Sequence, residues 1–467
     1  MGGIVIATMM TKNKTWYFLF GPGKDQLAGN RNEYSPGADT DLSSDGTSPP
    51  QTSGSGSQGS DLAGGSGAAK TASGKNIEAS SDFAADSGNG TDAPTATSTT
   101  EAATKTGTSD PKNKDTAAVK TEAVIAGFWE TWGSVPVADI PWAKYSHVIW
   151  FVVTPGDVAS KGALDFHASG ANNPADFVKR AKEGGSKSLF SIGGWTDSND
   201  FTYLMASAKS RTDFVNTIKA AFDRDSWDGV DLDWEYPSTA GATDDFDEKN
   251  DLPNYLAFFK ELRKALGPDK IITVDTSSLP WKDPSTGQPS KDLSGFVEYI
   301  DLFNVMTYDA FRGAISGPNF PYSGDCSPQG QTYNYKDAMK AWTDAKVPAE
   351  KLVLGMAAYG HSWTVDKFDE TGAAAGAKSP VFQNGVSKEG LQFTKIVENG
   401  LLDGAKLDEC TQTMYHYKDK VMTVFDNGES TKAKGKLAKA AKWAGCMVFA
   451  LDNDHDNEIV NAMRESC

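Results

Sequence analysis

The sequence predicts an α/β fold: a (β/α)8 TIM barrel with a small α+β insertion between strands seven and eight, preceded by a disordered N-terminal segment. From residue 123 onward, short runs rich in β-branched and aromatic residues alternate with helical patterns, and there are eight such runs. This alternation implies parallel strands joined by crossover helices, and eight units favour a closed barrel. An open doubly wound sheet is the alternative, but no G-x-G-x-x-G turn follows any of the runs.

The predicted strands are short, and the segments between them repeat with the period of a helix. Stretches such as 174–185, 211–225 and 252–267 place apolar residues at i, i+3, i+4 and i+7, and several end in glycine. The strands themselves are predicted over residues 124–129, 146–153, 187–194, 229–235, 271–278, 301–309, 351–360 and 445–452.

The connection between the seventh and eighth predicted strands is too long for one helix, at about 85 residues. Its last part, from residue 437, has the pattern of the expected helix. Residues 413–430 instead alternate like two antiparallel strands with a turn at 417–420. We therefore predict an α+β insertion over about 363–428, rising from the carboxyl-terminal rim of the barrel, where active sites lie.

The chain before the barrel has a different composition. Residues 34–120 consist mostly of Ser, Gly, Thr, Ala, Asp and Lys. Such a segment cannot bury enough apolar surface to offset its ordering entropy, so we expect it to be disordered, and it also resembles an O-glycosylated stalk. Residues 1–33 form an N-terminal segment of uncertain role, and the globular domain is expected over 121–467.

The net charge of the chain argues against some classes of binding partner. A net charge of −17 argues against nucleic acid, because an acidic protein gains nothing from counterion release. No membrane span is expected, since no stretch reaches roughly 18 apolar residues. A neutral polymer remains suitable, and we expect a monomer.

The cysteines bear on whether the protein is secreted or cytosolic. None of them forms a C-x-x-C pair and no His lies at ligand spacing, so no metal is expected. Two disulfides would fit a secreted protein, whereas four reduced thiols would fit a cytosolic enzyme. With the stalk-like segment, an extracellular or cell-wall location is favoured, although no basic region precedes the short apolar run near the N-terminus. The four are Cys326, Cys410, Cys446 and Cys467.

A row of acids occupies the fourth predicted strand, in the stretch "WDGVDLDWEYP" at 227–237. Side chains of a strand alternate faces, so Asp231, Asp233 and Glu235 share one face. These acids are expected to point into the barrel, with Glu235 nearest its mouth. A solvated edge strand is the alternative, but the opposite face is apolar. That face carries Val230, Leu232 and Trp234, and Asp228, of the same parity but at the start of the strand, is assigned a structural role.

Stacked acids in a barrel interior repel one another, so at least one must hold a proton. A carboxylic acid kept protonated near neutral pH can act as a general acid. Asp233 and Glu235 lie about 6–7 Å apart along one strand and approach a substrate from the same side. Neither can therefore attack an anomeric carbon from the face opposite the other, and the nucleophile must come from elsewhere, such as the substrate itself.

These motifs resemble those of glycoside hydrolase family 18, the chitinases, most closely the fungal branch. "DGVDLDWE" matches the family signature D-x-x-D-x-D-x-E, "SIGG" at 191–194 matches its strand-three motif, and "MTYD" at 306–309 matches its strand-six motif. The seventh strand and the insertion also match in position and kind. The resemblance covers roughly residues 123–467, with the motifs in the family's order.

The resemblance implies substrate-assisted retention, which requires no cofactor or metal. Glu235 would protonate the glycosidic oxygen, and the 2-acetamido carbonyl of the sugar would attack the anomeric carbon. Asp233 would orient the acetamido N–H, and Asp231 would share a proton with Asp233 beside Ser191. Tyr308 would hold the acetamido oxygen. The expected partner is chitin or a chitooligosaccharide.

Further residues are candidates for contacting the sugar. Trp195 follows the S-I-G-G turn and is expected to stack on a sugar, with a core position as the alternative. Phe128 and Trp129 end the first strand, and one of them is expected to line the cleft. Met306 is equally consistent with core and cleft wall, and Asp309 is expected to contact sugar.

One aromatic position departs from the family pattern. The eighth strand has Phe449 where the family usually has Trp as the floor beneath the distorted sugar. Phe still offers an aromatic face, with less area, so affinity and rate are in question but the class is not. His361, where the family often has Arg, is assigned no role.

Three other functions fit parts of the sequence. The first is a non-catalytic chitin-binding lectin, disfavoured because Glu235, Asp233 and Tyr308 are all present. The second is an endo-β-N-acetylglucosaminidase acting on N-glycans, disfavoured because an insertion that deepens the cleft suits a linear polymer. The third is a structural wall protein, which would rest on residues 34–120 alone. We therefore expect endo-hydrolysis of β-1,4 linkages in chitin.

Overall fold

A computed structural model shows how the chain folds. The residues that it describes include little of the N-terminal region. The segment 34–120, predicted to be disordered, lies outside the described residues. Within 1–33, strands β1 (Val5–Thr11) and β2 (Lys14–Phe20) pair antiparallel as a hairpin. The described residues are 5–11, 14–20, 123–168, 172–311, 316–326, 333–369, 385–388 and 390–467.

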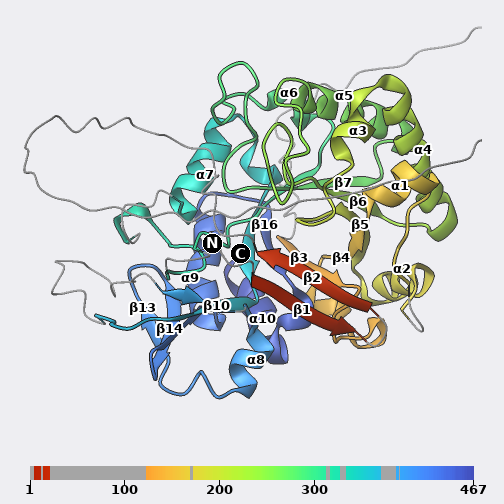
Figure 1. Ribbon diagram of the computed structural model, residues 1–467. Coiled ribbons are helices and arrows are strands. Elements are labelled where there is room, and N and C mark those ends of the chain that lie inside the picture. Colours follow the sequence, from red (N-terminus) through yellow and green to blue (C-terminus); the bar gives the residue numbers. More distant parts are fainter. Residues whose placement is uncertain are drawn as a thin grey trace, which may run out of the picture. The chain divides into compact units, whose positions relative to one another are not determined.

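Eight parallel strands close into a barrel, which confirms the predicted fold class (Figure 1). Each predicted strand is present, with ends that differ by a few residues. Around the barrel they pair in the order β16, β3, β4, β5, β6, β7, β8, β9. The strands are β3 (Val124–Glu130), β4 (His147–Val153), β5 (Lys187–Gly193), β6 (Gly229–Asp233), β7 (Ile271–Thr276), β8 (Leu302–Val305), β9 (Leu352–Ala357) and β16 (Gly445–Phe449).

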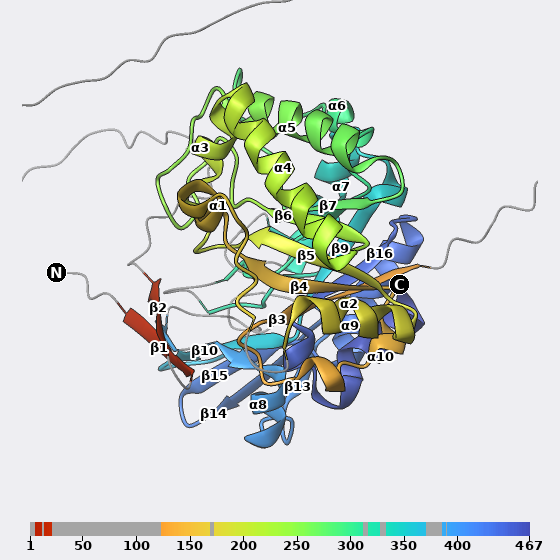
Figure 2. The same cartoon turned by 90° about the vertical axis from the view of Figure 1, so that its right-hand side faces the viewer.

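Helices surround the barrel, and their ends follow local sequence signals. Asn173 caps the second helix by accepting a hydrogen bond from the backbone of Asp176, and left-handed Gly185 ends it. Figure 2 shows α4 and α5 packed against each other outside the strands. The helices are α1 (Pro155–Lys161), α2 (Pro174–Gly184), α3 (Phe201–Ala206), α4 (Ala208–Asp225), α5 (Asp251–Leu266), α6 (Ser294–Val297), α7 (Tyr335–Asp344), α8 (Phe393–Glu398), α9 (Gly428–Ala440) and α10 (Glu458–Ser466).

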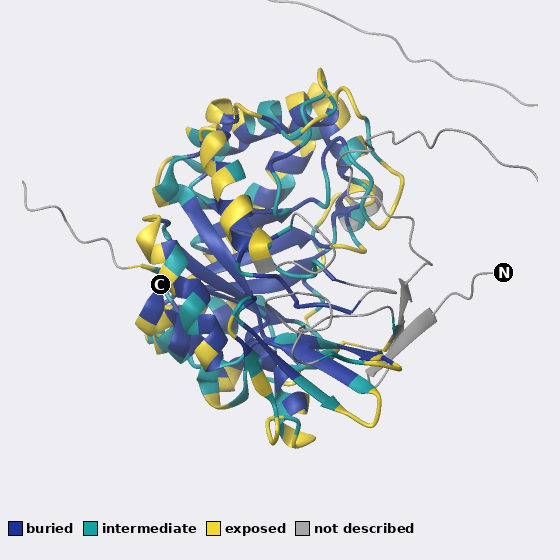
Figure 3. Ribbon diagram, turned by 90° about the vertical axis from the view of Figure 1, so that its left-hand side faces the viewer, coloured by how far each residue is buried: buried dark blue, intermediate teal, exposed yellow. Residues whose placement is uncertain are grey.

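The core has two main layers, because each barrel strand is buried on both faces (Figure 3). The outer layer, between strands and helices, includes the packed rings of Trp150, Phe177 and Trp227. The inner layer, inside the barrel, includes Phe128 and Phe151. Polar groups on an inner face are therefore surrounded by protein rather than by bulk water.

The chain between β9 and β16 forms the predicted insertion, built on an antiparallel sheet with helix α8. The turn between β14 and β15 is at Asp419 and Lys420, whose φ angles are 50° and 65°, as a tight hairpin turn requires. The sheet runs from residue 359 to residue 425. Its strands are β10 (Tyr359–Thr364), β11 (Val386–Ser387), β12 (Leu391–Gln392), β13 (Lys406–Asp408), β14 (Thr413–Lys418) and β15 (Val421–Phe425).

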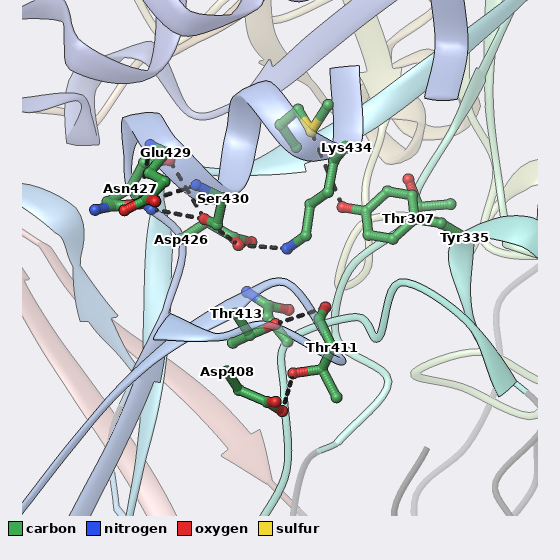
Figure 4. A network of polar contacts seen from close by, with 12 residues as sticks. Thr307, Tyr335, Asp408, Thr411, Thr413, Asp426, Asn427, Glu429, Ser430 and Lys434 are labelled. Atoms are coloured by element: carbon green, nitrogen blue, oxygen red, sulfur yellow. Dashed lines mark hydrogen bonds and ion pairs between the residues drawn. The ribbon is translucent and has the colours of Figure 1, made fainter. Parts of the chain in front are cut away.

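A buried ion pair joins the end of the insertion to the barrel (Figure 4). Asp426, directly after β15, pairs with Lys434 of α9, and both side chains are almost fully buried. Ser430 donates a hydrogen bond of 2.8 Å to Asp426. The Lys434 ammonium lies 5.3 Å from the ring centre of Tyr335, whose hydroxyl donates to the backbone of Gly355 on β9. The network therefore connects α9, α7 and a barrel strand.

Disulfides are present, so the alternative of four reduced thiols is wrong. Cys446 of β16 is bonded to Cys467, and their Cα atoms are 6.1 Å apart. Cys410 is disulfide-bonded as well. Among the described residues, no helix is both long and apolar enough to cross a membrane.

Candidate active site

The acids of β6 lie on its inner face, as the alternation of the sequence predicts. Asp231 and Asp233 are buried inside the barrel, while Glu235, just after the strand, is half-buried. Trp234 faces the helices, where its ring stacks on Phe201 at 5.2 Å. Asp228 accepts a hydrogen bond of 3.0 Å from the backbone of Ser188, which fits a structural role.

Asp231 accepts hydrogen bonds from three neutral donors, one each on β5, β7 and β8. The Ser191 hydroxyl donates to Oδ2 at 2.7 Å, and the Thr273 hydroxyl donates to Oδ1 at 2.5 Å. The Asn304 amide donates to Oδ1 at 3.3 Å. Burial raises the pKa of Asp231, and these donors oppose the rise by stabilising the carboxylate.

Asp233 lies above Asp231 and is surrounded differently. Burial raises its pKa well above the usual range, and the nearby charges of Glu235 and Asp231 add to the rise. Its Oδ1 atom is buried and has no hydrogen-bond partner among the described residues. A buried acceptor of this kind is costly unless a ligand satisfies it.

Glu235 is positioned through its backbone. The hydroxyl of Ser198, in the loop after β5, accepts a hydrogen bond of 2.9 Å from the Glu235 N–H. The same hydroxyl lies 2.9 Å from the carbonyl of Gly194 and 3.2 Å from that of Asp233. Ser198 therefore ties the carboxyl ends of β5 and β6 together beneath Glu235.

Tyr308 follows β8 and faces the acids. Burial raises the pKa of its hydroxyl well above the usual range, and the charge of Asp275 is the largest additional cause, with Asp233 and Glu235 contributing. The hydroxyl therefore stays protonated and can donate a hydrogen bond at any physiological pH. Its ring is packed near Tyr359, with ring centres 6.1 Å apart.

An aromatic floor lies next to Tyr308. The ring centre of Phe449 is 6.3 Å from that of Tyr308, 5.2 Å from Phe151 and 5.9 Å from Phe128. Phe449 is half-buried, whereas Phe128 is buried beneath it. Half-buried Met306 packs against the same cluster. The face of Phe449 is therefore the part of this cluster best placed to meet a ligand.

Asp309 directly follows Tyr308 and is paired with His361, a residue to which the sequence assigned no role. The His361 Nε2 and Asp309 Oδ1 atoms are 2.9 Å apart, and both side chains are largely buried. Asp309 has a φ of 62°, and its backbone N–H donates to Asn319. The Asp309 side chain is thus fixed from both its backbone and its carboxyl group.

Comparison with known proteins identifies the family to which this barrel belongs. The sequence profile of Glycosyl hydrolases family 18 matches residues 124–454. The chain belongs to glycoside hydrolase family 18. The match spans all eight barrel strands, from the first residue of β3 to just beyond β16.

Several family 18 relatives are similar over most of the barrel. A "chitinase-like effector" of Moniliophthora roreri is 32% identical, covering 73% of this chain and 92% of its own. "Chitinase C" of Streptomyces lividans is 31% identical, covering 60% of this chain and 44% of its own. The crystal structure of a chitinase from the fungus Rhizomucor miehei aligns with a TM-score of 0.65 at 28% identity, covering 73% of this chain and 99% of its own.

One residue predicted to bind substrate lies outside the family 18 site. Trp129 is fully buried between the strands and the helices, with its ring centre 4.8 Å from that of Trp150. Its indole N–H donates to the carbonyl of Val135 at 2.8 Å. The prediction is wrong for Trp129 because adjacent residues of a strand face opposite sides, and only Phe128 faces the barrel interior.

Trp195 lies at the rim of the family 18 barrel, directly after β5. Its side chain is 41% exposed, so the alternative of a core tryptophan is wrong. An exposed indole at the mouth of the barrel suits stacking on a sugar ring, and this role stays a prediction.

The structure adds polar residues that the sequence analysis did not single out. Thr273, Asn304 and Asp275 come from β7 and β8, and all three side chains are buried beside the acids of β6. Asp275 is the only charged residue of β7, which was the available signal. Among the described residues, no group of three or more His, Cys, Asp or Glu is arranged to hold a metal ion.

Proposed function

We propose that this family 18 protein is a chitinase that hydrolyses internal β-1,4 linkages between N-acetylglucosamine units. The observation that carries the proposal is the joint presence of Glu235, Asp233 and Tyr308 at one end of the barrel, where the buried Oδ1 of Asp233 has no hydrogen-bond partner within the described part of the chain. An acetamido N–H is a donor of the kind that this oxygen requires. The names of the relatives, which include "Chitinase C", support the same substrate class.

The proposed reaction begins with proton transfer from Glu235 to the glycosidic oxygen. The C1–O bond breaks as the 2-acetamido oxygen of the same sugar bonds to C1, giving an oxazolinium ion and a free sugar hydroxyl on the leaving chain. The Tyr308 hydroxyl donates to the acetamido oxygen and holds it in line with C1. Asp233 accepts the acetamido N–H and stabilises the positive charge of the ion.

The second step restores the enzyme. The Glu235 carboxylate takes a proton from water, the water oxygen bonds to C1, and the C1–O bond of the oxazolinium ring breaks. Two displacements at C1 leave the product with the β configuration. The half-buried position of Glu235 suits this role, because its carboxyl group must reach both substrate and water.

A non-catalytic chitin-binding protein is the second candidate. It is favoured by the names of two relatives, the "chitinase-like effector" and a "chitinase-like agglutinin" of Robinia pseudoacacia, the latter similar in fold at 21% identity. Against it stands the complete set of Glu235, Asp233 and Tyr308 in this chain. An extracellular location also belongs to the proposal, supported by the Cys446–Cys467 disulfide.

The deciding experiment is proton NMR of the full chain acting on chitotetraose, read within minutes of mixing. We expect products that are first β anomers and then equilibrate slowly. The Glu235→Gln variant is the control for contaminating activity. Binding without cleavage by the wild type would overturn the chitinase proposal in favour of the chitin-binding protein.

A further inference from the structure

Asp275 lies on the inner face of β7, beside the acids of β6. In the parallel pairing of the strands, Thr273 is opposite Asp231, and Asp275 is opposite Asn304 of β8. Thr273 and Asp275 share a face because strand side chains alternate. Asp275 therefore lies one layer above Thr273, level with Asp233. The barrel holds three buried carboxyl groups within two adjacent layers.

Hydrogen bonding distinguishes these carboxyl groups from one another. Asp231 accepts from the three neutral donors described above and is also hydrogen-bonded to Asp275. Two carboxylates cannot hydrogen-bond, so this contact requires a proton between them. Asp231, with its additional donors, is the better place for the negative charge. The proton therefore belongs to Asp275, which donates it toward Asp231.

Asp233 stands outside this pairing. The groups hydrogen-bonded to the side chain of Asp231 are Thr273, Asp275, Ser191 and Asn304, and Asp233 is not among them. After burial, the causes that raise the pKa of Asp233 are the charges of Glu235 and Asp231. The Oδ1 of Asp233 is buried without a hydrogen-bond partner among the described residues. The Oδ1 of Asp275 is buried without one as well, so the contact of Asp275 with Asp231 must involve its Oδ2. The hydrogen bonds of Asp231 therefore favour sharing of a proton with Asp275 over the sharing with Asp233 that the family resemblance implies.

We propose that Asp275 is a positioning residue for the reaction. By donating to Asp231, it occupies the acceptor with which Asp233 would otherwise share a proton, and it leaves Asp233 available for the acetamido N–H of the substrate. This role rests on the proposed function, because it assigns Asp233 the acetamido contact. Asp275 itself does not touch the sugar.

The surroundings of Asp275 agree with a protonated state. Burial raises its pKa well above the usual range, and the charges of Asp231 and Asp233 add to the rise. The other titratable groups facing it are the hydroxyls of Tyr308 and of Tyr255 on α5, whose pKa values are also raised.

Two substitutions separate the hydrogen bond from the shape of the side chain. Asp275→Asn keeps a donor for Asp231, and Asp275→Leu keeps a similar shape without a donor. Losing the donor raises the pKa of Asp231, because a hydrogen bond to the ionised form no longer favours it. Asp231 then takes up a proton at higher pH and shares it with Asp233. Asp408→Asn, at a buried carboxyl of the insertion sheet, is the matched control.

The readout is the pH profile of kcat for the full chain on chitotetraose, with thermal unfolding as a check of folding. For Asp275→Leu we expect the acid limb to move upward by about half a pH unit or more and kcat at pH 6 to fall about tenfold. Asp275→Asn is expected to keep the limb in place and to stay within about threefold of the wild type. A purely structural role would lower activity evenly without moving the limb.

A measurement of substrate binding makes this test independent of turnover. The dissociation constant of chitotetraose is measured by calorimetry between pH 5 and 8 for the same variants. We expect its weakening on the acid side to begin at higher pH in Asp275→Leu and not in Asp275→Asn. If the wild type binds but never hydrolyses, the chitinase proposal fails while this comparison still decides the role of Asp275. Coincident profiles for the wild type and a folded Asp275→Leu would overturn the inference.

Discussion

The Nε2 atom of His361 lies 2.9 Å from Oδ1 of Asp309, and this pair connects the insertion to the barrel. His361 is on β10, the first strand of the insertion sheet, whereas Asp309 follows β8. The insertion is therefore more than a wall beside the cleft. It fixes the carboxyl group of a residue that we predict to contact the sugar.

We predict that His361→Ala weakens substrate binding. Without its partner, the Asp309 carboxyl loses its fixed position, and kcat/KM for chitotetraose should fall about tenfold, mainly through KM. Steady-state kinetics provide the measurement. His455→Ala is the matched control, because His455 contacts only the exposed Asp456 among the acids described here. An unchanged KM would show that the pair does not order the binding site.

We predict that Glu235→Gln stops turnover and keeps binding. An amide cannot donate a proton as an acid, so kcat should fall by about 10²–10⁴ or more, whereas the similar shape preserves contacts with the sugar. Hydrolysis of chitotetraose and its dissociation constant are both measured. Glu183→Gln, on the exposed end of α2, is the matched control. Residual turnover above background in Glu235→Gln would remove Glu235 from the role of acid.

The barrel and the shared face of the acids on β6 could be predicted from the sequence, because both follow from patterns within single segments of the chain. Alternation along a single strand decides which residues share a face, so Asp231, Asp233 and Glu235 could be grouped without any knowledge of their neighbours. Partners on other strands depend on register, which no local pattern specifies. For that reason Thr273, Asn304 and Asp275 could not be joined to Asp231 in advance.

Two further cases show the same limit. Phe128 and Trp129 are both apolar, and a barrel strand is buried on both faces, so hydrophobicity could not tell the inner residue from the outer one. Lys434 belongs to a helix rich in lysine and resembles a solvated side chain. Its partner is Asp426, which lies eight residues earlier in the chain, directly after β15.

We predict that Phe449→Trp tightens binding. A larger aromatic face beneath the sugar should contribute about 1 kcal/mol, the usual worth of such contacts. The dissociation constant of chitohexaose is measured by calorimetry in a Glu235→Gln background, so that the ligand stays intact. Leu402→Trp, at an exposed turn of the insertion, controls for adding an indole elsewhere. An unchanged dissociation constant would argue that Phe449 does not form the floor.

We predict that removing one partner of the Asp426–Lys434 ion pair in Figure 4 destabilises the protein, whereas removing both charges together does so much less. Lys434→Met leaves the Asp426 carboxylate buried without its cation and should lower the free energy of unfolding by about 3 kcal/mol. The double variant with Asp426→Leu removes both charges and should recover most of that loss. Urea unfolding measures both. Equal destabilisation by the single and double variants would show that the packing of the network matters and its charge does not.

We predict that Glu130 makes the protein less stable as the pH rises. Burial, and then the charge of Asp452, raises the pKa of Glu130 from 4.5 to about 8. Burial also raises the pKa of Asp452 to about 7. Between pH 4.5 and 8, folded Glu130 therefore holds a proton that the unfolded chain has released. The free energy of unfolding must then decrease as the pH rises through this window.

Glu130→Gln replaces the titrating carboxyl group with an amide that binds no proton in this pH range and still offers an acceptor to Trp132. The melting temperature of the variant should fall less between pH 5 and pH 8 than that of the wild type, and the two curves should converge toward pH 5. Differential scanning calorimetry at several pH values makes the comparison. Glu398→Gln, at the exposed end of α8, serves as the control and should leave the slope unchanged. Parallel curves for Glu130→Gln and the wild type would mean that Glu130 titrates alike in the folded and unfolded chains.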